Sequence, residues 1–279
     1  MAGKTAYVTG GASGIGQAVS EMLASKGIKV CVGDMNLEGA QKTASQLGNG
    51  AMAVQVNAAD WDSQLAAFEK AVDAFGRLDY VFPIAGIGER AAIKNDPKAT
   101  RFQKPDLAVV DVDLTGVLYT SFLAVQQMRR QEKDKDGFRG KIAVTASVCG
   151  FYCVPTVPVY TAAKHGVVGF VRSYGKYLPE EGMTLNAVCP NVVRTSISTP
   201  AFYDKVDEQG VLTSIKDVVD AFASFLDTDT SGECMEVGPN GGFTPKAQAP
   251  HLDKETTSIL NMIEQRSHRL HEPEPDAGV

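Results

Sequence analysis

The chain has 279 residues, of which 44% are hydrophobic and 22% are charged, and its net charge is −6. Such a length and composition are ordinary for a soluble globular protein and suffice for one large α/β domain with its own core. The negative charge argues against a nucleic-acid-binding surface, and no apolar run reaches the ~18 residues that a membrane span needs.

The N-terminal segment has the pattern of a strand, a glycine-rich turn and a helix. The apolar residues 6–8 predict a short buried strand, and an apolar-periodic helix is expected from about Ile15. Between them, Gly10, Gly14 and Gly16 permit a tight turn and a close approach of the backbone to a pyrophosphate. The free N–H groups of the helix would then face the phosphates. The strand before and the helix after favour a dinucleotide site over an ordinary βα turn.

The next strand is expected over 28–33, and Asp34 follows at its end. A carboxylate at this strand end accepts hydrogen bonds from both ribose hydroxyls of an adenosine, and it repels a 2′-phosphate. We therefore expect NAD as the cofactor, with NADP disfavoured. The alternative is a simple loop or cap aspartate, and the spacing and the strand end both count against it.

Strand and helix patterns alternate along the rest of the chain. Further helices are expected over 38–47, 60–75, 105–130, 157–178 and 215–226, and further strands over 51–56, 78–82, 141–146, 183–188 and 234–237. This alternation predicts an α/β Rossmann fold, with a doubly wound seven-stranded parallel sheet and helices on both faces, in a single domain over 1–243. Ligands bind at the carboxyl ends of the strands in such sheets.

The segment 244–279 departs from this alternation and is rich in proline, histidine and charged residues. We expect a C-terminal extension with a helix over 253–269 and a frayed end. Three roles are open for it: cover for a neighbouring subunit, partial closure of the substrate pocket, or a plain surface extension.

Tyr160 and Lys164 are one helical turn apart, and Ser147 follows the expected strand 141–146. Tyrosine is a poor base because its pKa is about 10, but a lysine on the same helical face favours the phenolate. The serine hydroxyl can hold an alcohol or carbonyl oxygen. Together the three groups would move a proton on and off oxygen, while the partner step, hydride transfer, needs a cofactor. Surface or capping roles are the alternatives for each residue.

These motifs, in this order, resemble the classical short-chain dehydrogenase/reductase family. The matching residues are Thr9–Gly16, Asp34, Ala85, Gly86, Ser147, Tyr160, Lys164, Asn186–Pro190 and Thr195. Within the family, KHGVVGF and NVVRT are most similar to the branch of the NAD-dependent 15-hydroxyprostaglandin dehydrogenases. The resemblance implies hydride transfer between a secondary alcohol or ketone and a nicotinamide. It also implies a homodimer or homotetramer, formed through the helices 105–130 and 157–178.

The resemblance assigns Tyr160 as the general base, Lys164 as its activator, Ser147 as the holder of the substrate oxygen and Asp113 as a further catalytic group. The cofactor contacts are expected at Gly10, Ser13, Gly14, Ile15, Gly16, Asp34, Asn57, Ala85, Gly86, Tyr160, Lys164, Val193 and Thr195. The substrate contacts are expected at Ser147, Val148, Phe151, Tyr152, Val154 and Val192. This apolar wall favours a lipid-like, terpenoid or aromatic alcohol as the small-molecule substrate. The same residues are also ordinary core or interface filler.

Three positions depart from the family pattern. Pro83-Ile84 precede Ala85 where the family has two asparagines, and Asn57 stands where an aspartate is common. Asp113 replaces an asparagine that helps to hold a water-linked proton relay from the lysine. Its charge would pair with Lys164 and weaken the help that the lysine gives to the tyrosine. We therefore expect Asp113 to slow the chemistry or to shift its pH optimum.

Two rival functions stay open at this point. The first is a non-redox isomerase, dehydratase or cyclase that retains a dinucleotide, and the second is a non-catalytic dinucleotide sensor. The intact Ser147, Tyr160 and Lys164 argue against a sensor.

The segment MAGKTAYVTG has no basic region followed by an apolar one, and the five cysteines form an odd, scattered set. We therefore expect a cytoplasmic protein with reduced thiols. No histidine or second ligand pair lies near the cysteines Cys149 and Cys153, so no metal site is expected.

Overall fold

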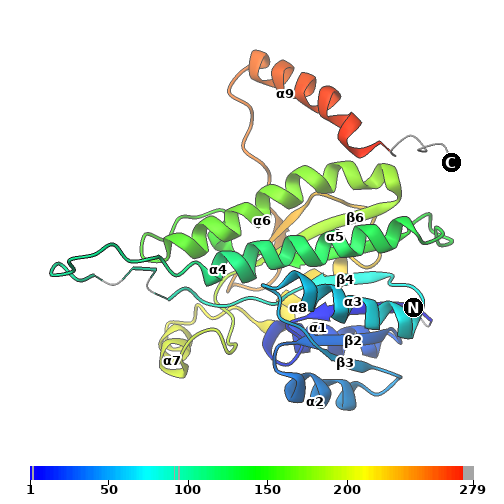
Figure 1. Ribbon diagram of the computed structural model, residues 1–279, viewed down its shortest axis with the longest axis horizontal. Helices are drawn as coiled ribbons and strands as arrows, with labels where there is room; N and C mark the ends of the chain where they lie inside the picture. Colours follow the sequence, from blue (N-terminus) through cyan, green and yellow to red (C-terminus); the bar gives the residue numbers. More distant parts are fainter. Residues whose placement is uncertain (2, 91, 94, 273–279) are drawn as a thin grey trace. The chain divides into compact units, whose positions relative to one another are not determined.

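The computed structural model describes residues 1, 3–90, 92–93 and 95–272 (Figure 1). The chain separates into two compact units, Met1–Lys246 and Ala247–Val279. The first unit holds every strand found among the described residues, together with the expected site. It ends beyond residue 243 because a short strand, Phe243–Pro245, is part of its sheet.

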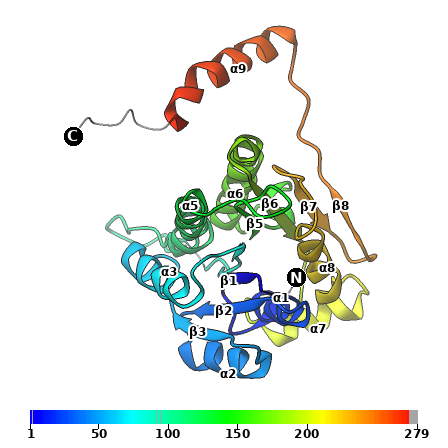
Figure 2. The ribbon, with the colours of Figure 1, turned by 90° about the vertical axis from the view of Figure 1, so that its right-hand side faces the viewer.

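One sheet of eight strands forms the centre of the first unit (Figure 2). The strands are β1 (Thr5–Thr9), β2 (Lys29–Asp34), β3 (Met52–Gln55), β4 (Tyr80–Pro83), β5 (Gly140–Thr145), β6 (Met183–Pro190), β7 (Cys234–Val237) and β8 (Phe243–Pro245). Their order is β3-β2-β1-β4-β5-β6-β7-β8. The first seven are parallel, which confirms the doubly wound Rossmann sheet. The eighth strand pairs antiparallel with β7 and was not expected, because its three exposed residues show no alternation.

Helices cover both faces of the sheet and bury two separate cores. On one face lie α1 (Gly14–Ser25), α2 (Leu37–Leu47) and α8 (Ile215–Ser224), and on the other lie α3 (Trp61–Phe75), α5 (Gly116–Arg129) and α6 (Pro158–Tyr177). The side chains of strand β1 point alternately into these two cores. Ala6 and Val8 pack toward α1 and α8, whereas Tyr7 packs toward α3, and all three are fully buried.

The helix expected over 105–130 is interrupted, which corrects the prediction of a continuous helix. A short turn, α4 (Ala108–Val110), runs into a π-helical turn at Asp111–Thr115 before α5 begins. At the junction the helix passes very close to the loop after β3, since a Cβ on Gly116 would lie 2.6 Å from the carbonyl oxygen of Ala58. π-helical turns are rare and are frequent at functional sites, and this one carries Asp113.

Among the described residues, one helical stretch, Ala108–Arg129, is long and apolar enough to cross a membrane. Half of its most apolar window is buried inside the fold. That burial is typical of a core helix in a soluble protein, and α5 packs against β4, β5 and α3.

Two further helices lie outside the alternating pattern. The helix α7 (Pro200–Glu208) was not expected; it begins with Thr199 as its cap and Pro200 in its first turn. In the second unit, α9 (Lys254–Ser267) begins after Asp253, which accepts a hydrogen bond from the N–H of Thr256. It lies within the expected range 253–269. The expected frayed end falls on residues 273–279, which lie outside the described residues.

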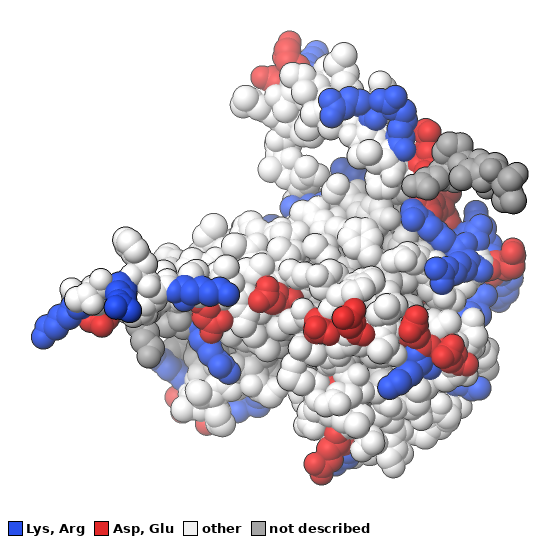
Figure 3. All heavy atoms as spheres, in the orientation of Figure 1, with Lys and Arg blue, Asp and Glu red and all other residues white. Residues whose placement is uncertain are grey.

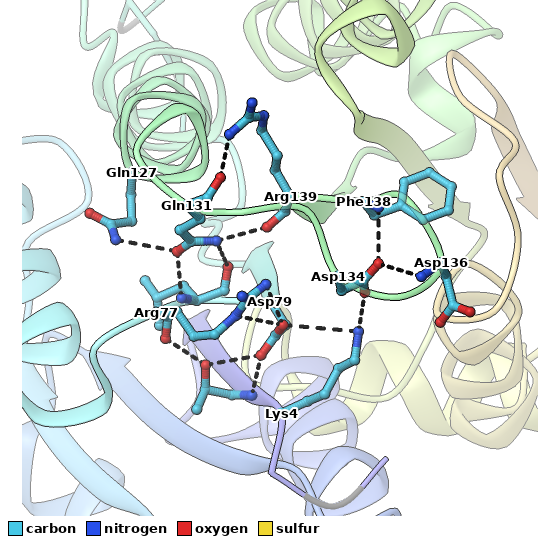
Figure 4. Close-up of polar contacts among 11 residues, drawn as sticks. Lys4, Arg77, Asp79, Gln127, Gln131, Asp134, Asp136, Phe138 and Arg139 are labelled. Carbon is cyan, nitrogen blue, oxygen red and sulfur yellow. Dashed lines mark hydrogen bonds and ion pairs between the residues drawn. The ribbon is translucent and has the colours of Figure 1, made fainter.

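A polar network fixes the amino ends of the strands (Figure 4). The buried Asp79 carboxylate accepts hydrogen bonds from the N–H of Thr5 at 2.9 Å and from Nε of Arg77 at 3.0 Å. The Gln131 amide bonds both the N–H and the carbonyl of Leu78. These contacts lie at the start of β1, β4 and β5, and so at the opposite edge of the sheet from the expected site.

Candidate active site

The catalytic candidates meet beyond the carboxyl end of β5, on α6 and on the loop before it. Pro158 starts α6 with its preset backbone angle, so Tyr160 lies in the first turn and Lys164 in the second. Lys164 Nζ lies 5.4 Å from the centroid of the Tyr160 ring and donates to the carbonyl of Thr145 at 3.3 Å. The buried Ser147 side chain accepts from the N–H of Cys149 at 3.1 Å. The structure therefore brings together the tyrosine and lysine that the sequence predicts, beside Ser147.

Asp113 forms a buried ion pair with Lys164, as the family resemblance and its charge imply. Its Oδ2 lies 3.0 Å from Lys164 Nζ, and its Oδ1 accepts from the N–H of Ile87 at 2.8 Å. The Oδ2 atom has no well-aligned hydrogen bond, so the contact to the lysine is one of charge and distance. A Cβ on Gly86 would lie 3.0 Å from the same oxygen, which explains the glycine beside it.

Burial has the largest influence on the pKa of Tyr160, and the two charges of the ion pair act on that pKa in opposite directions. Burial raises the pKa of Tyr160; the charge of Lys164 lowers it, and the charge of Asp113 raises it again. A hydrogen bond from Ser147 also lowers it. Lys164 thus lowers the pKa of Tyr160 in the expected direction, but burial and the charge of Asp113 act against it, and the net pKa of Tyr160 is above its ordinary value.

Lys164 stays charged in the same surroundings. Burial lowers the pKa of Lys164, but the charges of Asp113 and Tyr160 outweigh burial and leave it raised. The lysine therefore remains a cation across the neutral pH range. Its positive charge acts on both the Asp113 carboxylate and the Tyr160 phenol.

The glycine-rich turn has the geometry of a phosphate cradle. Gly10 and Gly14 have φ angles of +74° and +55°, which favour glycine. A Cβ on Gly16 would lie 2.2 Å from the carbonyl oxygen of Gly10, and one on Gly10 would lie 2.8 Å from Ala85. Ser13, the residue before α1, makes no side-chain cap, so the first N–H groups of the helix stay available to an anion. The turn therefore fits the pyrophosphate of a dinucleotide.

Asp34 is held at the end of β2, beside this turn. Its two carboxylate oxygens accept from the N–H of Ala12 at 3.0 Å and of Asn36 at 2.9 Å. Each oxygen keeps a further lone pair for a ribose hydroxyl. Asn57 uses its side-chain oxygen on the N–H of Ala59 at 3.1 Å, which leaves its amide N–H₂ to donate.

Thr9, at the end of β1, supports the loop after β4, where Pro83-Ile84 replace the two asparagines of the family pattern. Thr9 Oγ1 accepts from the N–H of Ile84 at 3.1 Å and of Ala85 at 3.3 Å. Ala85 and Gly86 are thereby held against the glycine-rich turn, where both were expected. Sequence reasoning missed this role of Thr9.

The loop after β6 reaches the glycine-rich turn. A Cβ on Gly14 would lie 3.2 Å from a methyl carbon of Thr195, and the Ser13 and Ser196 hydroxyls are 3.3 Å apart. Val193 is buried in the core, so only its backbone is free to meet a cofactor. Tyr203 of α7 holds the loop, with its hydroxyl 3.1 Å from Thr195 Oγ1. The role of Tyr203 was missed because α7 was not expected.

The expected substrate wall is only partly gathered at the site. Val148 and Val192 are half-buried and Val154 is exposed. Phe151 stacks under Arg172 of α6, whose guanidinium carbon is 5.3 Å from the ring centroid. Tyr152 turns toward β7 and β8: its hydroxyl donates to Glu236 at 3.0 Å and accepts from Lys246 at 2.6 Å.

Comparison with known proteins agrees with this geometry. A family model described as short chain dehydrogenase matches residues 4–205. The short-chain dehydrogenase/reductase prx7 of Penicillium rubens is 34% identical over 197 residues, which cover 68% of this chain and 69% of that protein. The NAD(+) 15-hydroxyprostaglandin dehydrogenase of Homo sapiens is 35% identical over 202 residues, 70% of each chain.

Solved structures show the same fold. The 3-hydroxyacyl-CoA dehydrogenase type-2 from Mycobacterium avium superposes with a TM-score of 0.74 at 28% identity, covering 88% of this chain and 98% of that one. Fold, motif order and site geometry agree with the sequence comparisons. The chain therefore belongs to the short-chain dehydrogenase family, and it is an oxidoreductase that uses a nicotinamide dinucleotide on a small-molecule substrate.

Proposed function

We propose that the protein interconverts a secondary alcohol and a ketone with NAD as the redox partner. The observation that carries this proposal is the meeting of Tyr160 with Lys164, beside Ser147, at the strand edge where the glycine-rich turn offers free N–H groups. The family and the NAD(+) dependence of the human relative support it.

The residues divide the proton chemistry among them. Ser147 donates a hydrogen bond to the substrate oxygen and holds it beside Tyr160. In oxidation the Tyr160 phenolate takes the hydroxyl proton, and in reduction the phenol returns it. Lys164 stabilises the phenolate by charge, and the bound nicotinamide supplies the acceptor or donor of the hydride. Asp113 opposes Lys164, so the phenolate forms less readily than it would beside an unpaired lysine.

Asp34 favours NAD over NADP. Its carboxylate is fixed by two backbone N–H groups, so it cannot turn away to make room for a 2′-phosphate. Two lone pairs remain for ribose hydroxyls, whereas a phosphate there would meet a like charge.

The substrate wall supports an apolar substrate. Val148 and Val192 are half-buried apolar residues, and Val154 is an exposed one. A lipid-like, terpenoid or aromatic alcohol fits such a wall better than a sugar.

The surface over α5 and α6 supports a homodimer or homotetramer. It is largely free of charged side chains in the view of Figure 3. Phe122 is 42% exposed there and packs against Phe170 and Tyr174, with ring centroids 5.7 Å apart in each pair. We place the enzyme in the cytoplasm, where its five free thiols would stay reduced.

The test is the absorbance of reduced nicotinamide during turnover, measured with NAD and NADP against steroid, prostanoid, terpenoid and aromatic secondary alcohols. NAD-dependent turnover that Tyr160→Phe abolishes would support the proposal. Turnover of a substrate without net change in cofactor absorbance would favour the non-redox enzyme. Tight NAD binding with no turnover of any alcohol or ketone would favour the sensor.

A further inference from the structure

Glu89 makes a hydrogen bond to the backbone of the catalytic tyrosine. Its Oε2 accepts from the N–H of Tyr160 at 2.7 Å, across 71 residues of sequence. The Glu89 side chain is half-buried and lies in the loop after β4, not on α6. A short bond from a carboxylate to an N–H is a charge-assisted one, and such bonds are roughly twice as strong as neutral ones.

The helix α6 has no cap of its own at this end. Its N-cap residue is Val157, which makes no side-chain cap, and Pro158 has no N–H to satisfy. The N–H of Tyr160 is one of the donors that an α-helix leaves without a partner inside the helix. Glu89 satisfies it from a distant segment, and its negative charge is favourable at a helix N-terminus.

The loop that carries Glu89 is also hydrogen-bonded to the π-helical turn that precedes α5. Asp113, in the π-helical turn, accepts from the N–H of Ile87 at 2.8 Å. The loop after β6 also touches it, since a Cβ on Gly88 would lie 3.1 Å from a methyl carbon of Ile197. The segment from Gly86 to Glu89 therefore links the expected cofactor contacts Ala85 and Gly86 to the first turn of α6 and to the π-helical turn that carries Asp113.

We propose that Glu89 is a positioning residue for Tyr160. It fixes the first turn of α6 relative to the loop that begins at Ala85 and Gly86, and so sets where the phenol lies against substrate and cofactor. This inference rests on the proposed dehydrogenase function. It concerns a residue that bonds the backbone of Tyr160 rather than its phenol. A displacement of about 1 Å at a reacting centre can lower a rate by up to a hundredfold.

Three variants separate geometry from charge. Glu89→Gln keeps the length and an accepting oxygen, Glu89→Asp keeps the charge but loses reach, and Glu89→Ala loses both. We expect kcat to fall about tenfold or more in Glu89→Ala and Glu89→Asp. In Glu89→Gln we expect kcat to fall by about threefold or less. The KM for NAD should change by less than about twofold, because the phosphate cradle and Asp34 are untouched.

Asp60→Ala is the matched control. Asp60 caps α3 through the N–H of Ser63 at the same 2.7 Å, but it lies outside the site. It should lower the melting temperature without lowering kcat. With a carbinol-deuterated substrate, the isotope effect on kcat should rise in Glu89→Ala and stay unchanged in Asp60→Ala, because only misplacement of the phenol slows the chemical step.

Amide hydrogen exchange at Tyr160 tests the cap without turnover. Exchange at this amide should be about fivefold to tenfold faster in Glu89→Ala than in the wild type, and near wild type in Glu89→Gln. Unchanged exchange overturns the inference. Faster exchange with unchanged kcat also overturns it, since the cap would then be structural only. A wild-type enzyme without turnover refutes the proposed function instead, and the exchange result remains interpretable.

Discussion

The Asp113 carboxylate lies 3.0 Å from the Lys164 ammonium, and neither side chain is more than 3% exposed. An asparagine at this position would leave the full lysine charge to act on the phenol. With the aspartate, the pair is close to neutral as seen from Tyr160, whose pKa is raised by burial and by Asp113. The pair therefore acts on the same tyrosine with two opposite charges, and a change to either charge is expected to move the pKa of Tyr160.

We predict that Asp113→Asn shifts the activity profile to lower pH. The base in oxidation is the phenolate, so the rate rises as pH approaches the pKa of Tyr160. Removal of the Asp113 charge lowers that pKa and moves the rising limb down. Oxidation at neutral pH should increase about threefold to tenfold, because each unit of pKa changes the phenolate fraction tenfold. The measurement is kcat against pH for both proteins. An unchanged profile would show that Asp113 does not control the tyrosine.

Asp34 should decide the choice between the two dinucleotides. Asp34→Ala removes both acceptors for the ribose and the charge that repels a 2′-phosphate, so KM for NAD should rise about tenfold or more while KM for NADP falls. Asp34→Asn keeps one acceptor for the N–H of Ala12 or Asn36, and it controls for loosening of the turn. Equal effects on both cofactors would place Asp34 outside the ribose site.

Much of this site is predictable from local sequence. Parallel strands buried on both faces give short apolar runs between turn signals, as in residues 6–8, and their carboxyl ends must converge on one edge. Tyr160 and Lys164 share one helical face, so their proximity follows from spacing alone. The pairing of Asp113 with Lys164 was expected from the family resemblance, which places Asp113 at the site, together with the opposite signs of the two charges.

The remaining parts depend on contacts that sequence periodicity does not record. The π-helical turn at Asp111–Thr115 shifts the helical phase by one residue only once, so the apolar pattern of 105–130 still resembles one helix. Glu89 lies in a loop without periodicity, and its carboxylate accepts a hydrogen bond from the N–H of Tyr160, 71 residues away in the sequence. The strand at Phe243–Pro245 depends on β7 for its hydrogen bonds, and its own three residues are exposed.

Gly16→Ala should disable the cofactor site. The added methyl would lie 2.2 Å from the Gly10 carbonyl oxygen and 3.1 Å from the Gly11 nitrogen, so the turn must open. We expect affinity for NAD to fall more than about tenfold, with a loss of about 1–3 kcal/mol in the free energy of unfolding from overpacking.

Gly169→Ala is the matched control for this change. Gly169 also lies inside a helix, but a methyl there meets nothing within 4 Å and its φ is not positive. This variant should be more stable by about 0.5–1 kcal/mol and bind NAD normally. Isothermal calorimetry and urea unfolding on both variants decide the matter. Normal NAD affinity in Gly16→Ala would contradict the cradle.

Asp79 should matter for stability and not for catalysis. Its buried carboxylate accepts from the N–H of Thr5 and from Arg77 at the amino edge of the sheet (Figure 4). Tyr160 and Lys164 lie beyond the opposite, carboxyl edge. Asp79→Asn removes the negative charge that Arg77 faces. It also leaves the buried donors of Thr5 and Arg77 poorly paired, so the free energy of unfolding should fall by about 1–3 kcal/mol. The midpoint of urea unfolding should fall while kcat and its pH profile stay unchanged.

A surface ion pair provides the contrast for Asp79. Lys216→Ala breaks an exposed pair with Asp220 one helical turn away, and such pairs contribute less than about 1 kcal/mol. If Asp79→Asn costs no more than Lys216→Ala, the network at the amino edge does not anchor the strands. If instead it lowers kcat at full stability, the two edges of the sheet are coupled, and the positions of β1 and β4 bear directly on the glycine-rich turn and the loop that follows β4.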